Sequence, residues 1–245
     1  MIRLADLWKA FGDKQVLAGV TLEVRDGETM VLIGYSGTGK SVVLKHIVGL
    51  LHPDRGEVFV DDQAVSTLER SALNVLRRDI GYVFQFAALF DSMTVADNVA
   101  LGLRRRNLDE EEIADRVEDA LAVVDLTGAG ERYPAELSGG MRKRVGIARA
   151  IAGSPKYLLY DEPTSGLDPV NADIIDDLVV HLADQLGVTS VMVTHDVRGA
   201  FRVADRLALL TDGKIVAQGT KDEFHASKNP KVKIFLERDF PSFAA

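Results

Sequence analysis

The segment Gly34-Tyr35-Ser36-Gly37-Thr38-Gly39-Lys40-Ser41 constrains this chain more than any other feature. Two glycines five positions apart, followed by Lys and Ser, form the pattern of a phosphate-binding loop. The segment follows the apolar run at residues 29–33 and precedes a helical pattern at residues 42–51. Glycines let the backbone close around a phosphate chain, and the first N–H groups of a helix favour an anion. We therefore predict that residues Gly34 to Val42 bind a nucleotide, with Lys40 on its β- and γ-phosphates and the Ser41 hydroxyl on Mg²⁺.

Composition permits a sizeable core and narrows the possible partners. Hydrophobic residues make up 47% of the 245 residues, the net charge is −8, and there is no Cys. The negative charge argues against nucleic acid as the main partner, and the lack of Cys excludes disulfides and thiolate metal sites. No apolar run approaches the roughly 20 residues that a membrane-spanning helix needs, and the first residues lack a signal-peptide core. We therefore expect a soluble protein that another chain brings to any membrane it serves.

Apolar runs that alternate with helical patterns favour an α/β fold with a mostly parallel sheet. Residues 2–8 and 16–24 read as an N-terminal pair of strands, and residues 207–210 and 215–218 as a final hairpin. From residue 86 to about residue 153, strand-like alternation stops and helical stretches take over.

This change of pattern predicts the internal organisation of a single domain at residues 1–245. Its parts would be an α/β core at residues 1–85 and 154–225, an inserted helical subdomain at residues 86–153, and a C-terminal tail at residues 226–245.

Polar side chains follow three predicted strands, at the sheet edge where ligands of parallel sheets bind. Gln85 ends one strand, Asp161 and Glu162 end the apolar run 157–160, and His195 ends the run 189–194. Hydrolysis of a nucleotide needs a positioned water and stabilised charge on the γ-phosphate. Asp161 would hold Mg²⁺, directly or through water, and Glu162 would orient or deprotonate the attacking water.

A second candidate anion site lies at Ser138-Gly139-Gly140, just before a predicted helix. Ser138 can cap that helix, and the glycines leave its first N–H groups exposed. One phosphate tail does not need two such sites from one molecule. A dimer, in which the second site serves the partner's nucleotide, is the simplest explanation.

Taken in order, these motifs resemble the ATP-binding cassette (ABC) ATPases. The phosphate loop, Gln85, Leu-Ser-Gly-Gly at 137–140, the run 157–162, Ser-Gly-Leu-Asp at 165–168 and His195 carry the resemblance, which covers residues 1–225. It implies a P-loop (RecA-like) core, an N-terminal antiparallel β part and the inserted helical subdomain. It also implies a head-to-tail homodimer that sandwiches two ATP molecules. Each ATP would lie between one chain's phosphate loop and the partner's signature segment, residues 137–140, in which Ser138, Gly139 and Gly140 contact it.

The resemblance also implies roles for single residues. Gln85 would contact Mg²⁺ and the attacking water, His195 would contact the γ-phosphate, and Asp168 would shape the dimer interface. Phe11 would stack on adenine where the family usually has Tyr, although a core or hairpin aromatic is the alternative. Met141 stands where the signature usually ends in Gln, so one polar contact to the nucleotide is lost or supplied elsewhere.

Three segments look most like the Mla-type ATPases, which power bacterial phospholipid transport: residues 35–45, 84–95 and 137–145. This likeness implies an integral permease, an MCE-type lipid-binding protein and a small regulatory subunit as partners. The chain would then sit at the cytoplasmic face of the inner membrane. An amino-acid or ion importer is the main alternative, and a soluble non-transport ABC ATPase or a nucleotide-gated module without hydrolysis fits less well.

Two segments have more than one interpretation. The apolar stretch 86–98 is either core of the helical subdomain or part of a groove that grips a permease helix. The tail, with Val232, Phe235, Leu236 and Phe240, either docks on its own domain or reaches the neighbouring ATPase.

Overall fold

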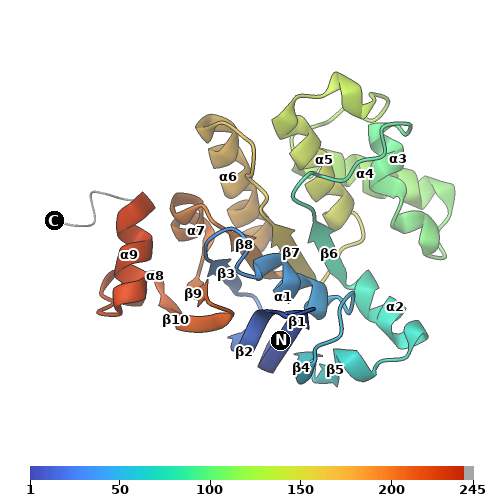
Figure 1. Ribbon diagram of the computed structural model, residues 1–245. Helices are drawn as coiled ribbons and strands as arrows, with labels where there is room; N and C mark the ends of the chain where they lie inside the picture. The colour runs from blue at the N-terminus through green and yellow to red at the C-terminus, as the bar shows by residue number, and fades with distance from the viewer. Residues whose placement is uncertain (240–245) are drawn as a thin grey trace. The chain divides into compact units, whose positions relative to one another are not determined.

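The computed structural model describes residues 1–239, which form two compact units (Figure 1). The first unit comprises residues 1–74 and 189–245, as far as these are described, and the second comprises residues 75–188. The helix α2 (Arg70–Arg78) spans the division. Among residues 1–239, no helix combines the length and the apolar character needed to cross a bilayer.

The first unit begins with an antiparallel sheet of strand order β2-β1-β4-β5. Its strands are β1 (Ile2–Phe11), β2 (Lys14–Val24), β4 (Arg55–Val60) and β5 (Gln63–Ala64), and η1 (Val65–Thr67) follows. Ile2 pairs with Val24 on one side and with Val60 on the other. The predicted N-terminal pair is therefore present, and β4 extends it.

A second group of strands in this unit has the order β10-β9-β3-β8. Its members are β3 (Thr29–Ile33), β8 (Thr189–Thr194), β9 (Arg206–Thr211) and β10 (Lys214–Thr220). Strand β3 runs parallel to both β8 and β9, whereas β10 returns antiparallel. Every residue of β3 and β8 is buried, which explains the apolar runs at residues 30–33 and 191–193.

The helices of the first unit are α1 (Lys40–Ile47), α7 (Val197–Val203), α8 (Lys221–His225) and α9 (Pro230–Asp239). Helix α1 ends at Ile47, not at residue 51 as the apolar pattern predicts, because the chain turns at Gly49, whose N–H donates to the His46 carbonyl. Figure 1 shows α8 and α9, in red, beside β10.

The second unit has two parallel strands, β6 (Ile80–Val83) and β7 (Tyr157–Asp161), in which Val83 aligns with Tyr160. Its helices are α3 (Val95–Ala100), η2 (Leu103–Arg105), α4 (Glu110–Val123), η3 (Pro134–Glu136), α5 (Gly139–Ile151) and α6 (Pro169–Leu186). The fully described stretch from 86 to 153 contains helices and turns but no strand. Where that helical part is divided from the core stays a prediction.

Candidate functional site

The phosphate loop leaves the end of β3 and closes onto the start of α1. Gly39, the residue before α1, has φ of +101°, a left-handed conformation that glycine adopts without steric cost. The Lys40 ammonium lies 2.7 Å from the Gly34 carbonyl oxygen and 3.1 Å from that of Tyr35. The loop thus holds Lys40 by its own main chain, with only 5% of the residue exposed.

His195 lies at the same sheet edge as this loop. Ile33 and Thr194 are aligned partners in the parallel pair β3–β8, so Gly34 and His195 leave neighbouring strands at matching positions. His195 is exposed to solvent. Both residues therefore lie at the strand ends where ligands of parallel sheets bind.

Phe11 stands at the end of β1 with 47% of its surface exposed. The Lys9 ammonium lies 5.7 Å from the centre of its ring. The strand β2, which begins three residues later, meets the phosphate loop, since a Cβ at Gly39 would lie 2.9 Å from the Val16 side chain. The exposed ring is therefore not core; a hairpin aromatic and a stacking platform for adenine both stay open.

The second unit carries the carboxylates. Asp161 ends β7, and Glu162 follows it with φ of +48°, a strained backbone conformation of the kind that gathers at functional sites. Each of the two residues is only 8% exposed. The Tyr82 hydroxyl donates to Asp161 at 3.1 Å, and burial together with the Asp161 charge raises the pKa of Tyr82.

Gln85 lies just beyond β6, which is paired with β7. Because Val83 and Tyr160 are aligned, Gln85 and Asp161 leave neighbouring strands at the same edge. The Gln85 side-chain amide donates to the Ser165 hydroxyl at 3.2 Å. The structure therefore brings Gln85 together with the segment that follows Glu162.

The signature segment begins α5. The Ser138 side chain caps this helix by accepting from the Met141 N–H at 3.2 Å, as its pattern predicts. Ser138 and Gly139 are exposed, so the helix N-terminus faces solvent. A Cβ at Gly140 would lie 2.8 Å from the Asn171 side-chain oxygen, which explains why this position is glycine.

Asn171 links the signature segment to Asp168. Its side-chain amide donates to the Asp168 carboxylate at 2.6 Å, and Asp168 caps α6 by accepting from the N–H groups of Val170 and Asn171. These hydrogen bonds, the Asn171 side chain first, lower the pKa of Asp168. An ionised Asp168 and the exposed end of α5 are thus tied together through one side chain.

Comparison with known proteins identifies the family to which this chain belongs. A family model described as "ABC transporter" matches residues 17–165. The chain is 43% identical to the Arabidopsis thaliana protein TRIGALACTOSYLDIACYLGLYCEROL 3, chloroplastic, over 96% of this chain and 73% of the plant protein. It is also 43% identical to a methionine import ATP-binding protein MetN of Legionella pneumophila, over 88% of this chain and 63% of that protein.

The chain belongs to the ABC transporter family.

A solved structure agrees with this assignment. The dimeric, post-hydrolysis ATP-binding cassette MJ0796, bound to ADP and phosphate, superposes with a TM-score of 0.81 at 34% identity, covering 90% of this chain and 98% of that chain. The α/β fold is thus that of an ABC cassette, and the chain is an ABC ATPase that binds ATP and hydrolyses it to ADP and phosphate.

Two residues near the ABC motifs were not predicted from the sequence. One is Asn171, and the other is Lys143, on α5, which is 7% exposed. The Lys143 ammonium donates to the Gln85 carbonyl and approaches the Glu162 carbonyl at 3.5 Å. Burial lowers the pKa of Lys143, and the Glu162 charge partly opposes this. In the run Arg142-Lys143-Arg144, nothing in the sequence distinguishes the buried Lys143 from the two arginines beside it.

The apolar stretch after Gln85 has two interpretations, core of the helical subdomain or part of a permease groove, and its burial bears on the first. Phe86 is 82% exposed and Phe90 57% exposed, so these rings are not core, whereas Ala87 is buried. The Arg149 guanidinium donates to the carbonyls of Ala87 and Ala88, and a buried Asn98 side chain bonds Phe90. The loop is therefore a built structure that presents two aromatic rings to solvent.

Proposed function

We propose that this chain is the ATP-hydrolysing subunit of a lipid transporter, working as a head-to-tail homodimer on a membrane permease. The observation that carries the lipid assignment is the 43% identity, over 96% of the chain, to a plant protein named for trigalactosyldiacylglycerol, a glycerolipid. The likeness of residues 35–45, 84–95 and 137–145 to phospholipid-transport ATPases supports it.

The resemblance to the ABC ATPases assigns a proposed role to each site residue. Lys40 neutralises charge on the β- and γ-phosphates, the Gly34–Val42 backbone cradles them, and Phe11 stacks on adenine. Glu162 accepts a proton from the attacking water, which Gln85 orients, and His195 contacts the γ-phosphate. Glu162 is buried, so its carboxylate is positioned in a site largely shielded from bulk water. A general base must be held within reach of the proton that it accepts.

The chemistry of the donor set fits Mg²⁺. The Ser41 hydroxyl, the Asp161 carboxylate and the Gln85 amide oxygen are hard oxygen donors, which this ion prefers. Bound Mg²⁺ would neutralise charge that develops on the phosphates. The Tyr82 hydroxyl, bonded to Asp161, orients that carboxylate.

The dimer interface that we propose is the exposed face around the signature segment. Ser138 and Gly139 are exposed at the start of α5, and Asp168 is exposed at the start of α6. Val170 is 70% exposed and Ile174 45% exposed, one helical turn apart on α6. Apolar side chains beside an anion-binding helix end suit a surface that closes on a partner and its nucleotide.

The permease would bind at the loop that carries Phe86 and Phe90. Exposed aromatic rings on a rigid loop are typical anchors of a protein interface, because they lose little conformational freedom on binding. By the same resemblance, an MCE-type lipid-binding protein and a small regulatory subunit complete the assembly, at the cytoplasmic face of the inner membrane.

A methionine importer is the second candidate, favoured by the 43% identity to MetN. Purification of the tagged chain with its partners from membranes separates the two. The lipid proposal predicts that phospholipid co-purifies. It also predicts that, when the complex is placed in lipid vesicles, its ATPase turnover depends on the lipid that they contain. Turnover stimulated by methionine and a methionine-binding protein, with no bound lipid, would replace it. Loss of ATP binding in Lys40→Ala is the control for the phosphate loop.

A further inference from the structure

Helix α9 buries one face against the first unit. Val232 is 1% exposed, Phe235 2% and Leu236 6%, whereas Ile234 is 61% exposed. Polar contacts fix the start of the helix, since the Asn229 amide donates to the Val216 carbonyl on β10 at 3.0 Å. Residues 229–237 therefore dock on their own chain, and the predicted contribution of Phe240 lies outside the described residues.

The buried face of α9 reaches the phosphate loop. The rings of Phe235 and Tyr35 meet edge to face, with their centres 5.1 Å apart and their planes at 69°. This is a favoured geometry for an aromatic pair. Tyr35 is the second residue of the Gly34–Ser41 loop, so its ring packs on α9 while its main chain belongs to the loop.

The main chain of Tyr35 in turn organises the loop. Its carbonyl oxygen accepts from the Thr38 N–H at 3.3 Å, from the Thr38 hydroxyl at 2.9 Å and from the Lys40 ammonium at 3.1 Å. A displacement of Tyr35 therefore moves an acceptor that holds the lysine side chain. Two steps, ring to ring and carbonyl to ammonium, connect α9 to Lys40.

We propose that Phe235 is a positioning residue for ATP binding, through which α9 holds Tyr35 and hence Lys40. Docking of α9 and occupancy of the phosphate loop then stabilise each other, because coupling between two binding events is reciprocal. Displacement of helix α9 from its docked position would therefore lower the affinity of the phosphate loop for nucleotide. This inference rests on the proposed role of Lys40 and adds a source of control to it.

The test compares Phe235→Ala with Ile234→Ala, the neighbouring exposed position on the same helix. Loss of one aromatic pair predicts an ATP Kd raised about three- to tenfold in Phe235→Ala, and unchanged in Ile234→Ala. The kcat at saturating ATP should stay within about twofold of that of the unchanged chain, because the carboxylates lie elsewhere. Phe235→Leu keeps apolar volume for α9 docking but lacks the ring, so it should still raise Kd.

The reciprocal measurement needs no substitution. Amide hydrogen exchange in residues 230–237 should slow when the unchanged chain is saturated with ADP or ATP, because nucleotide favours the docked helix. A purely structural role of Phe235 would instead lower the melting temperature and kcat together, with Kd unchanged. Either an unchanged Kd in both Phe235 variants or an unchanged exchange rate overturns the proposal.

The outcomes also separate this inference from the proposed function. If Lys40→Ala binds ATP as tightly as the unchanged chain, the phosphate-loop assignment itself fails. If Lys40→Ala loses binding while the Phe235 and Ile234 variants behave alike, only the positioning role fails.

Discussion

At the scale of single residues, Glu162 is the group that we propose as the base in hydrolysis. It is buried, follows the end of β7 and has a left-handed backbone with φ of +48°. Substitution by Gln keeps the size of the side chain but removes the proton acceptor. Because a general base contributes about 10²- to 10⁴-fold, kcat in Glu162→Gln should fall at least about 100-fold.

Phosphate release and ATP binding, measured on the same sample, check this expectation. ATP affinity should stay within about twofold, since a base acts mainly in the transition state. Glu118→Gln, an exposed residue on α4, is the control and should leave both quantities unchanged. Turnover of Glu162→Gln within a few fold of that of the unchanged chain would remove Glu162 from this role.

Lys143 joins Glu162 and Gln85 through their carbonyl oxygens. Lys143→Met keeps the aliphatic stem but leaves both carbonyls without this donor, at a cost of about 1–3 kcal/mol for each buried group that stays unpaired. We expect kcat to fall about tenfold, with the ATP Kd close to that of the unchanged chain. Steady-state kinetics should show this split in Lys143→Met but not in Arg142→Met, an exposed neighbour. Equal kcat values in the two variants would show that Lys143 does not position the base.

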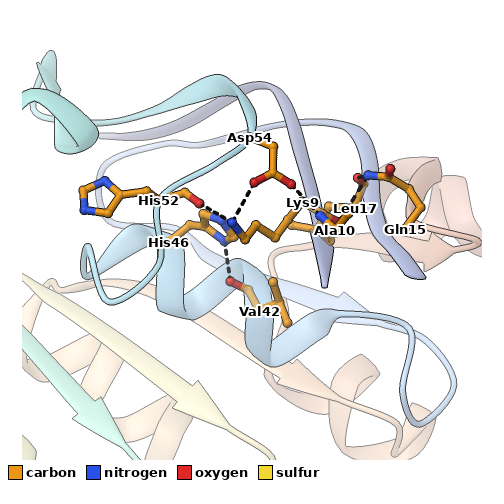
Figure 2. A network of polar contacts seen from close by, with 8 residues as sticks. All are labelled: Lys9, Ala10, Gln15, Leu17, Val42, His46, His52 and Asp54. Carbon is orange, nitrogen blue, oxygen red and sulfur yellow. Dashed lines mark hydrogen bonds and ion pairs between the residues drawn. The ribbon is translucent and has the colours of Figure 1, made fainter. Parts of the chain in front are cut away.

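We expect His46, which Figure 2 shows with its partner Val42, to make the stability of the first unit depend on pH. Its Nδ1–H donates to the Val42 carbonyl at 2.7 Å, and its Nε2 is buried with no hydrogen-bond partner among residues 1–239. Burial lowers the pKa of His46, and the nearby charge of Lys9 adds to this, against the Val42 hydrogen bond and the Asp54 charge. The unfolded chain therefore binds more protons than the folded chain below the ordinary His pKa of about 6.5.

The sign of the effect follows. Stability from the neutral His46 is complete above about pH 6.5 and is lost as the pH falls further, by at most about 1.4 kcal/mol per pH unit. Urea unfolding at pH 8 and pH 5 should show that the stability difference between His46→Asn and the unchanged chain shrinks at the lower pH. His52→Asn, an exposed neighbour drawn in Figure 2, should show no such change. A difference that is the same at both pH values would contradict this account.

At the scale of elements, the loop between β6 and α3 is built to present Phe86 and Phe90. Asn98, fully buried, bonds both the N–H and the carbonyl of Phe90, and Arg149 holds the carbonyls of Ala87 and Ala88. These hydrogen bonds stabilise the main chain of the loop, so the fold of the loop does not depend on burial of the two rings.

A double substitution, Phe86→Ser with Phe90→Ser, tests this loop as an interface. Because the rings are exposed, stability should change by no more than about 0.5 kcal/mol, and the basal ATPase rate should stay the same. Pull-down of the membrane partner should fall at least about tenfold, as expected when aromatic anchors are removed. Val75→Ser, another exposed apolar position, is the control. Undiminished partner capture would place the permease contact elsewhere.

These elements also show how far sequence reasoning reaches. The phosphate loop, the strand-end residues Asp161 and His195, and the Ser138 cap follow from local spacing, so the structure places them at the strand and helix ends that were predicted. Lys143, Asn171 and the Phe235–Tyr35 pair depend on contacts between segments distant in the chain, and no local pattern marks them. For the apolar stretch after Gln85, burial excludes a core position for Phe86 and Phe90, which periodicity could not do, and the permease groove stays a prediction.

At the scale of the whole molecule, the central claim is that one chain does not complete an ATP site. Ser138, Gly139, Asp168, Val170 and Ile174 are all exposed at or near the starts of α5 and α6. In the proposed dimer, a partner copy brings the ATP bound in its phosphate loop to these residues, and each of them then contacts the ATP or the partner.

The most direct test is the solution mass of Glu162→Gln, measured by light scattering with and without ATP and Mg²⁺. Without nucleotide, the account predicts the mass of one chain, 26.7 kDa. With saturating ATP, it predicts twice that mass, because a chain that cannot hydrolyse ATP should stay in the closed dimer. Adding Ser138→Arg should block the doubling by filling the signature face. A mass that stays at 26.7 kDa while ATP is bound would contradict the composite site.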